Sequence, residues 1–400
     1  MSCLADTAQS WQIKCKIMDN KNKVIGIEAC DDYDKTNVRN ALQRLLEKTD
    51  GLDFVRPGMR VAIKTNLVSA SAPEKAIVTH PAVITALTEL LQEKGAQVVI
   101  GDSPGGLFTP GILEKNYRLS GLMEAKEAGA ELNLDVSVQE VSHPEGKVMH
   151  SFTCTSWLLQ ADAVIDCCKL KTHGMMGMSA NVKNMFGVIP GTMKPEYHFR
   201  FPNHEDFADM LVDINTCIKP CLYITDAIVG MEGNGPTSGT PRKIGALLAS
   251  KDPYGLDVLC AHLIGLNPAQ IPTIAAAQKR GLCTFSIEDL SVLGDPEKFV
   301  VSDYEHVTKL KSLEFSSVVP SFALPAVRKI LKARPKVKKD ECIGCGKCRD
   351  ICPAKAIRME KKKPVIDTSL CIRCFCCQEF CPKGAMKVHR SLITRILVKG

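Results

Sequence analysis

Nine of the 19 cysteines in this 400-residue chain lie between residues 342 and 381. They form two copies of one pattern, Cys-x2-Cys-x2-Cys-x3-Cys-Pro, which begin at Cys342 and Cys371, 29 residues apart. A disulfide framework explains them poorly, because such frameworks belong to small secreted domains. A chain of this length with 45% hydrophobic residues can build its own core. The repeat therefore indicates a duplicated metal-binding half-domain.

The spacing of the repeat predicts which cysteines act together. Three cysteines on one tight loop suit three corners of a 4Fe–4S cluster, and in this pattern the last cysteine of the other copy supplies the fourth ligand. We therefore predict two clusters, held by Cys342, Cys345, Cys348 and Cys381, and by Cys371, Cys374, Cys377 and Cys352. Structural zinc, the alternative, usually uses two Cys-x2-Cys pairs. For the additional Cys376 we expect a buried thiol, with alternative ligation and redox sensing as the other interpretations.

Residues 340–390 resemble the bacterial two-cluster ferredoxin module, with a match at every ligand position. The resemblance implies a small α+β electron-transfer domain. Residues 328–400 hold 20 Lys and Arg against 6 Asp and Glu, whereas the rest of the chain holds 31 against 38. The basic charge offsets the negative clusters in part, and it suits an acidic redox partner. Few aromatic residues interleave the basic runs, so we expect no nucleic-acid partner.

The residues before this module alternate short β-branched runs with helical stretches. A helix is expected over residues 81–94, ended by Gly95. Strands are expected at residues 61–64, 97–100, 163–166, 222–225 and 244–248. This alternation predicts an α/β body with a mainly parallel sheet flanked by helices.

We divide the chain into four parts from its composition. These are an α/β body (1–325), a basic linker (326–339), the two-cluster domain (340–390) and a tail (391–400). No apolar run approaches the roughly 20 residues that a membrane span needs. The N-terminal residues lack a signal-peptide pattern. We therefore expect a cytoplasmic protein without a membrane partner.

The body has no Walker A loop and no intact dinucleotide fingerprint. The segment of the body that we consider the best candidate for a functional site runs from residue 169 to residue 198. It is rich in Lys, His, Asn and Gly. It follows a predicted strand, where ligands of parallel sheets bind. Several cations with glycines that permit close backbone approach suit an anionic ligand. A solvated surface loop is the alternative. The candidate residues are Lys169, Lys171, His173, Lys183, Asn184 and Lys194.

Several motifs recur in this order in one known family. They are Lys64-Thr-Asn66, His80-Pro81, Gly101-Asp-Ser-Pro-Gly-Gly106, Lys169-Leu-Lys-Thr-His173, Lys183-Asn-Met-Phe-Gly187, Pro190-Gly191, Gly230-Met-Glu-Gly-Asn-Gly-Pro236 and Asp252-Pro-Tyr-Gly-Leu-Asp257. Over residues 55–285 the body thus resembles the domain of unknown function 362 family, whose members often carry a ferredoxin module. The family label implies no reaction. The basic segment with its Pro-Gly turn is also faintly similar to lactate racemase, which does not imply a nickel cofactor.

Other polar residues have a structural and a functional interpretation each. Asp102 either forms a turn or orients a lysine or a metal. Asp226 and Glu232 either flank a strand end structurally or share a metal or a proton. Asp252 is expected to cap a helix, His80 to be structural, and Cys167 and Cys168 to be buried inert thiols.

From these features we predict an iron–sulfur electron-transfer protein. The first hypothesis is an oxidoreductase in which Lys171 and His173 deliver protons, while Lys169, Lys183, Asn184 and Lys194 bind an anionic small-molecule substrate. The second is a non-enzymatic electron carrier or cluster scaffold whose body docks a redox partner protein. A third, a redox-sensing regulator of nucleic acid, requires salt-dependent binding that follows the cluster state. The residues identify no further organic cofactor.

Overall fold

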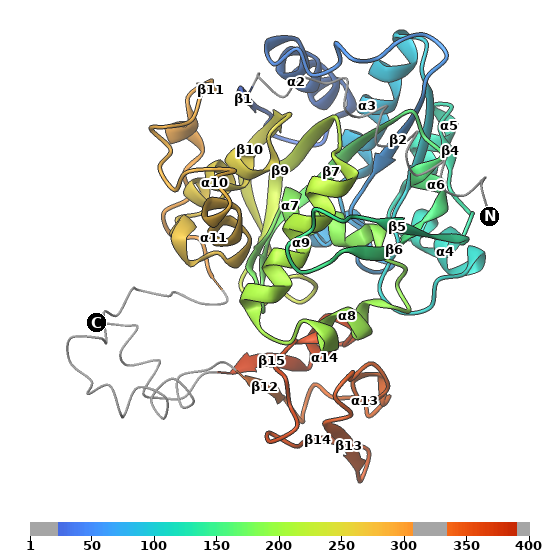
Figure 1. Ribbon diagram of the computed structural model, residues 1–400, viewed down its shortest axis with the longest axis vertical. Helices are drawn as coiled ribbons and strands as arrows, with labels where there is room; N and C mark the ends of the chain where they lie inside the picture. Colours follow the sequence, from blue (N-terminus) through green and yellow to red (C-terminus); the bar gives the residue numbers. More distant parts are fainter. Residues whose placement is uncertain (1–22, 307–333, 390–400) are drawn as a thin grey trace.

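The computed structural model describes residues 23–306 and 334–389. These residues form a large body and a smaller C-terminal module below it (Figure 1). Within the described ranges, no helix is both long enough and apolar enough to cross a membrane.

The body is built on one mixed sheet. Its strand order is β11-β1-β10-β9-β7-β2-β3-β4, and β8 pairs with β7 beside this path. The strands are β1 (Ile25–Ala29), β2 (Arg60–Lys64), β3 (Gln97–Gly101), β4 (Glu131–Leu132), β7 (Ala163–His173), β8 (Gly177–Ser179), β9 (Leu222–Glu232), β10 (Thr240–Ser250) and β11 (Val292–Leu293). The run from β9 to β4 is parallel throughout, whereas β10 is antiparallel to both of its neighbours. The predicted α/β fold with a mainly parallel sheet is confirmed.

Helices cover both faces of this sheet (Figure 1). The sheet therefore separates the apolar core into two clusters, one on each face. On β2, Ala62 joins one apolar cluster while Val61 and Ile63 join the other, because successive strand residues point to opposite faces. One face carries α2 (Lys35–Lys48), α3 (Pro81–Glu93), α4 (Pro110–Leu119) and α5 (Met123–Glu127). The other carries α6 (Ser156–Leu159), α7 (Asn181–Asn184), α9 (His204–Ile218), α10 (Pro253–Leu263) and α11 (Pro272–Lys279). A hairpin of β5 (Val138–Ser142) and β6 (Ser151–Thr155) lies outside the main sheet.

The central strand β7 is longer than predicted. The sequence pattern ended it at residue 166, but the strand continues to His173, and all eleven of its residues are buried. Lys169, Lys171 and His173 therefore belong to the strand and not to a loop. The extension is stabilised by β8, which folds back and pairs with residues 171–173. The helix expected over residues 81–94 is α3, with Lys94 as its C-cap and Gly95 in the left-handed region.

The C-terminal module consists of two short antiparallel ribbons and two helical turns. They are β12 (Arg334–Val337) with β15 (Met386–His389), β13 (Ile357–Glu360) with β14 (Lys363–Ile366), α13 (Lys347–Asp350) and α14 (Cys376–Glu379). The module begins at Arg334, so the predicted linker of residues 326–339 is wrong over β12. An isolated two-stranded ribbon tolerates Pro335 at its edge, which is why the proline did not mark a linker. Residues 326–333 and 391–400 lie outside the described residues.

Candidate functional site

A buried ion pair marks the carboxyl ends of β2 and β3. The Nζ atom of Lys64 lies 3.0 Å from Oδ1 of Asp102, and both side chains are almost fully buried. Asp102 also accepts hydrogen bonds from the backbone N–H groups of Leu67 and Ser103, at 2.6 and 2.8 Å. The residue therefore shapes its turn and orients a lysine, the two functions that the sequence left open. A Cβ atom at Gly187 would lie 2.1 Å from the Asp102 carboxylate, so only glycine permits this close approach.

Lys171 begins a buried chain of hydrogen bonds. Its ammonium donates to Oδ1 of Asn66 and to the carbonyl of Ile77, both at 2.7 Å. Asn66 donates in turn to Asn184 at 2.7 Å, and Asn184 donates to Asp166 at 2.8 Å. Burial, with Lys183 and Lys169 nearby, lowers the pKa of Lys171 to about 7. Asn184 thus holds its neighbours in place, and its hydrogen-bonding groups are used within the protein.

Lys169 belongs to a separate, fully paired network. Its Nζ atom lies 2.5 Å from Asp226, 2.7 Å from the hydroxyl of Tyr33 and 3.1 Å from the Val229 carbonyl, which accounts for all three N–H groups. The ring of Tyr33 stacks on that of His80, whose Nδ1 atom accepts from the first turn of α3. The structure therefore places Lys169 apart from the other predicted anion-binding lysines.

Most of the secondary candidates have structural partners. Asp226 does not share a group with Glu232, which accepts from the backbone N–H of Glu305 at 3.0 Å. Asp252 caps α10 through the N–H of Tyr254. Cys167 and Cys168 are completely buried.

His173 faces a carboxylate of the C-terminal module. Its Nδ1 atom accepts from the N–H groups of Met175 and Met176, both at 3.1 Å, so the proton of the neutral ring is on Nε2. Nε2 lies 2.8 Å from Oε1 of Glu379, although the angle is not that of a hydrogen bond. Burial and Lys183 lower the pKa of His173 to about 4. Burial alone would raise the pKa of Glu379, but His173, Lys183 and His198 lower it below its usual value.

Three consecutive residues, Gln378, Glu379 and Phe380, attach the module to the body, and we call them the docking triplet. Gln378 donates to the carbonyl of Gly235 at 2.9 Å and to Oδ1 of Asn234 at 3.0 Å. The ring of Phe380 covers Gly105, where a Cβ atom would lie 2.1 Å from the ring. Figure 1 shows α14 on the side of the module that faces α8 (Lys194–Arg200) of the body.

The docking triplet was not predicted from the sequence, although the cysteine repeat contained a signal. At the same positions of the first copy stand Arg349, Asp350 and Ile351. There Arg349 pairs with Asp350, and both side chains are more than half exposed. The difference between the two copies distinguishes the half that faces the body.

Several basic side chains meet next to Glu379, and together we call them the basic site. It comprises Lys171, His173, Lys183, Lys194 and His198, which act on one another or on Glu379 electrostatically. Burial lowers the pKa of Lys183. It lowers the pKa of Lys194 to about 8 and that of His198 to about 3. Within the part of the chain that the structure describes, Lys183 has no hydrogen bond or ion pair, and Nδ1 of buried His198 has no partner. Lys194 donates to the carbonyl of Ser103.

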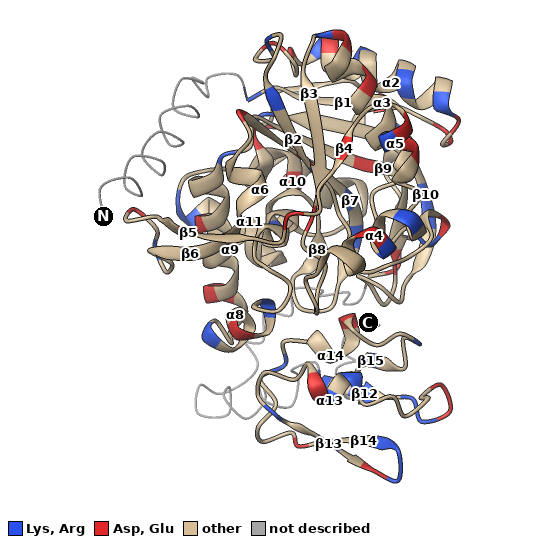
Figure 2. Cartoon of the chain, turned by 90° about the vertical axis from the view of Figure 1, so that its right-hand side faces the viewer, with Lys and Arg blue, Asp and Glu red and all other residues tan. Residues whose placement is uncertain are grey.

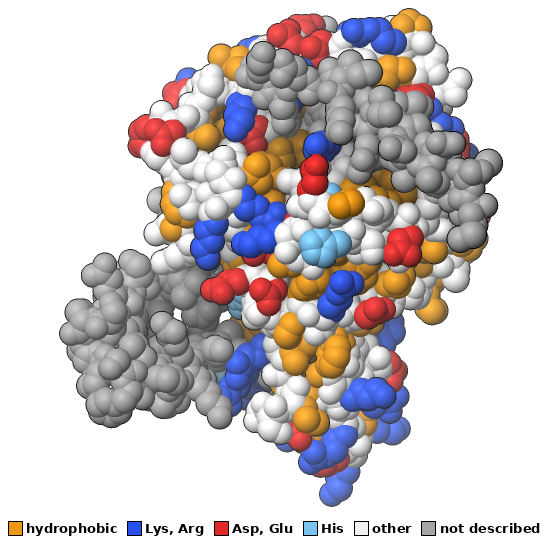
Figure 3. Space-filling model, viewed as in Figure 1, with side chains coloured by type: hydrophobic (Ala, Val, Ile, Leu, Met, Phe, Trp, Pro, Cys, Tyr) orange, Lys and Arg blue, Asp and Glu red, His pale blue; other side chains and the backbone are white. Residues whose placement is uncertain are grey.

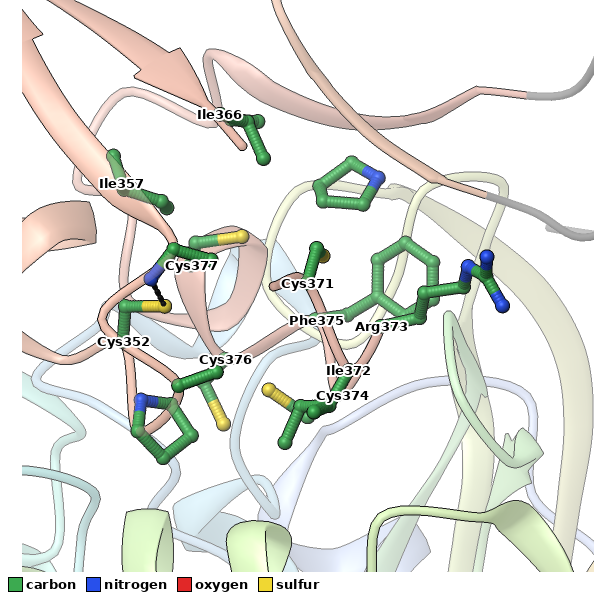
Figure 4. Close-up of a pocket in the computed structure, with 14 residues that line it drawn as sticks. Cys352, Ile357, Ile366, Cys371, Ile372, Arg373, Cys374, Phe375, Cys376 and Cys377 are labelled. Atoms are coloured by element: carbon green, nitrogen blue, oxygen red, sulfur yellow. Dashed lines mark hydrogen bonds between the residues drawn. The ribbon is translucent and has the colours of Figure 1, made fainter. Parts of the chain in front are cut away.

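The cysteines of the module line two cavities that match the two predicted ligand sets. One is lined by Cys342, Cys345, Cys348 and Cys381. The other is lined by Cys352, Cys371, Cys374 and Cys377, together with Cys376 (Figure 4). In Figure 4 the sulfur atoms of Cys352, Cys374 and Cys377 point toward the shared space, whereas that of Cys376 points out of it. Among the described residues, no three His, Cys, Asp or Glu side chains converge on a single point as ligands of one ion would.

The backbone around the two cavities is suited to thiolates. The N–H of Ala356 lies 3.3 Å from the sulfur of Cys352, and the N–H of Ala385 lies 3.1 Å from that of Cys381. Each donor follows the fourth cysteine of its copy by four residues, so the two halves repeat the same bond. Hydrogen bonds to sulfur stabilise negative charge on it and tune cluster potentials. The residues present therefore fit a pair of iron–sulfur clusters.

Comparisons with known proteins agree with this division. A family model described as domain of unknown function 362 matches residues 61–262. A second model, a 4Fe–4S dicluster domain, matches residues 334–382 and so includes β12. A thylakoid-associated protein from Synechocystis sp. is 33% identical over 299 residues, which is 73% of this chain and 90% of that protein.

Two solved structures are more distantly similar. The lactate racemase apoprotein from Thermoanaerobacterium thermosaccharolyticum is 11% identical with a TM-score of 0.38, over 60% of this chain and 56% of that one. A protein from Thermotoga maritima is 13% identical with a TM-score of 0.32, over 54% and 55%. This chain thus spans little more than half the length of either.

Proposed function

Because the chain belongs to the domain of unknown function 362 family and carries a 4Fe–4S dicluster domain, we propose that it is an iron–sulfur oxidoreductase. The dicluster domain gives it an iron–sulfur electron-transfer role. In the proposed reaction, the cysteines of the module would hold two 4Fe–4S clusters, and an anionic small molecule bound at the basic site of the body would exchange electrons with them. When bound, such clusters supply electrons one at a time.

The observation that carries this proposal is the position of Glu379. This residue stands between Cys377 and Cys381 in the cysteine repeat, and its carboxylate lies against His173 of the body. A carrier domain that only served other proteins would need no such buried contact. The contact brings the loop of the second cysteine copy next to the basic site, where we propose that the anion binds.

Lys171 and His173 are the proposed proton donors. A lysine whose pKa is about 7 changes charge near neutral pH, which suits a general acid. His173 holds its proton on Nε2, the atom that faces Glu379, because two backbone N–H groups occupy Nδ1. Transfer of electrons and protons to the same bound molecule requires both sets of groups near one place.

The anion would be held chiefly by Lys183, Lys194 and His198. Lys183 is the cation of the basic site without a hydrogen bond or ion pair among the described residues, and Nδ1 of His198 is likewise unpartnered. A buried polar atom without a partner is costly, so a ligand that supplies a partner for Nδ1 of His198 would be stabilised. Lys169 and Asn184 would position neighbouring groups, since their bonds are already made.

Iron content tests the ligand assignment. We expect about eight iron atoms per chain in protein purified without oxygen, as two 4Fe–4S clusters require. Cys374→Ser should lose about half of the iron, because Cys374 is a predicted ligand. The matched control, Cys376→Ser, should keep all of it, since this sulfur points out of the cavity. Full iron content in Cys374→Ser, or equal losses in both variants, would contradict the assignment.

Native mass spectrometry followed by reoxidation tests the reaction. Additional mass on the anaerobically purified chain would identify the bound molecule. The dithionite-reduced protein should then be reoxidised by that molecule or by a related anion. We expect Lys183→Met to weaken binding at least tenfold, while Lys171→Met slows reoxidation more than binding. Reoxidation that is equally fast in all variants would leave the carrier hypothesis as the better one.

We also propose a cytoplasmic location, which cell fractionation tests. The relative from Synechocystis sp. is named as thylakoid-associated. Recovery of this chain in the membrane fraction would contradict the proposed location.

A further inference from the structure

The cysteines that line the two cavities differ in how far they are exposed. In the first cavity, Cys345 is exposed, and the neighbouring Ile343 side chain is 60% exposed. In the second cavity, Cys374 and Cys377 are buried, and α14 attaches to the body. The first cavity therefore has an exposed cysteine, while the second adjoins the helix that attaches to the body.

Five exposed lysines surround the first cavity, and we call them the basic collar. They are Lys339, Lys347, Lys361, Lys362 and Lys383. Lys383 lines the cavity itself, and the carbonyl of Lys362 lies so close to Gly344 that a Cβ atom there would be 2.6 Å away. Lys363 donates to the carbonyls of Lys339 and Cys342, at 2.7 and 2.6 Å, and so ties the collar to a predicted ligand.

The charge of the collar is not neutralised within the module. Residues 334–389 contain 14 Lys and Arg against 6 Asp and Glu. Three of the carboxylates, Glu341, Asp350 and Glu360, already pair with basic residues outside the collar. Figure 3 shows Lys and Arg side chains gathered on the module, whereas charges of both signs are mixed over the body. Figure 2 marks the positions of the same residue types along the backbone. None of the five collar lysines has an ion pair among the described residues.

We propose that the basic collar is the docking surface for an acidic one-electron carrier protein that supplies electrons to this chain. The destination of those electrons in the body rests on the proposed function. One electron leaves the reduced centre of the carrier and enters the module. The carrier is thereby oxidised and the module reduced, and no bond forms or breaks.

The observations favour a protein over a lipid surface or a nucleic acid. Lysines around a small exposed apolar side chain, Ile343, match an interface in which charge steers the encounter and an apolar contact brings the redox centres close. An interfacial membrane helix needs a long apolar face, whereas α13 beside the collar has four residues. Nucleic-acid platforms use exposed aromatic rings, whereas the ring of Phe375 is buried and that of Phe380 covers Gly105.

Binding measurements with a flavodoxin, an acidic one-electron carrier, test the proposal. Calorimetry should show binding that weakens about tenfold or more between about 20 and about 200 mM salt. The variant Lys361→Glu/Lys362→Glu/Lys383→Glu should weaken binding by about tenfold or more at low salt. The control Lys94→Glu/Lys115→Glu/Lys126→Glu makes the same charge change on exposed lysines of the body and should bind normally.

Stopped-flow reduction gives a second measurement. Reduced flavodoxin should reduce the collar variant about tenfold more slowly than the control, whereas the small cation methyl viologen should not be slowed. An equal visible spectrum and iron content in both variants would show that the module is intact.

Two results would overturn the proposal. One is an equal affinity of the collar variant and the control for flavodoxin. The other is salt-dependent binding to vesicles of phosphatidylglycerol and phosphatidylcholine that the collar variant abolishes, with no binding of flavodoxin. Neither experiment contains a small-molecule substrate. Failure of the collar is therefore distinguishable from failure of the proposed reaction.

Discussion

Three lysines of the body, Lys169, Lys171 and the half-buried Lys183, differ in how many of their N–H groups have acceptors. An ammonium has three. Lys169 has three acceptors and Lys171 has two, whereas Lys183 has none among the described residues. The number of N–H groups left for a ligand therefore increases from Lys169 to Lys183. In the sequence alone, the three residues cannot be distinguished, because all are lysines of one segment.

His198 provides a test of burial at the level of a single residue. Its folded pKa is about 3, and the pKa of an unfolded histidine is about 6.5. Between these values the unfolded chain binds the extra proton, so stability falls as the pH falls from 6.5 toward 3. His198→Phe keeps the stacking on Phe207 and removes the proton site. Between pH 7 and pH 5 the variant should lose about 2 kcal/mol less stability than the parent.

Urea unfolding at both pH values measures this difference. His150→Gln is the control, because that imidazole is exposed. A pH dependence that is unchanged in His198→Phe would show that His198 is not held neutral by burial.

The ligand cysteines could be predicted because the signal is local. Their spacing within one loop and the repeat of that loop are visible in the sequence. The partners of Lys169 could not be predicted, because Tyr33 is 136 residues away in the sequence and lies in the segment between β1 and α2. For the same reason the sequence predicted that Asn184 binds a ligand, although its side chain forms hydrogen bonds with Asn66 and Asp166.

At the level of elements, β7 and α14 carry the site. The start of β7 was predictable from its β-branched run, but its continuation through Lys169 and Lys171 was not. Polar side chains are rare in a buried strand, and the partners of these residues lie in the segment after β2, on β9 and on α14. The helix α3 was predictable almost to the residue, because a proline at its start and a glycine after its end are sequence-level signals.

The contact between Phe380 and Gly105 makes the docking of α14 testable. Gly105→Ala places a Cβ atom about 2 Å from the ring, so we expect α14 to be displaced and the amides of β8 to exchange faster with solvent. Phe380→Ala in the same chain should relieve the clash, so that the double variant is less perturbed than the sum of the single variants. Hydrogen exchange with mass spectrometry measures both effects.

Gly111→Ala is the control for this cycle, because no atom lies within 4 Å of a Cβ at that position. Additive effects of the two single variants would mean that the ring and the glycine are not in contact in solution.

At the level of the whole molecule, the body and the C-terminal module differ in how their folds are stabilised. The body has two extensive apolar cores, one on each face of its sheet. The buried core of the module consists of Cys348, Ile357, Cys377 and Met386. Two-stranded ribbons of this size are marginal without further support. Metal sites that stabilise such small folds contribute directly to folding.

Removal of iron should therefore unfold the module and leave the body folded. After anaerobic treatment with a chelator, we expect trypsin to cleave within residues 334–389 while residues 23–306 stay protected. Circular dichroism should retain most of the helix and strand signal of the body. Loss of the body and the module together, or resistance of the module without iron, would contradict this division of stability.

A duplicated module has approximate twofold symmetry, and a symmetric part can be attached in either of two orientations. The side chains of the docking triplet remove that ambiguity, because the first copy has Arg349, Asp350 and Ile351 in their place. The two halves are therefore no longer interchangeable, as they would have been immediately after duplication. Exchange of these three residues between the halves would attach the module to the body in the opposite orientation. The order in which electrons pass through its two halves would then be reversed.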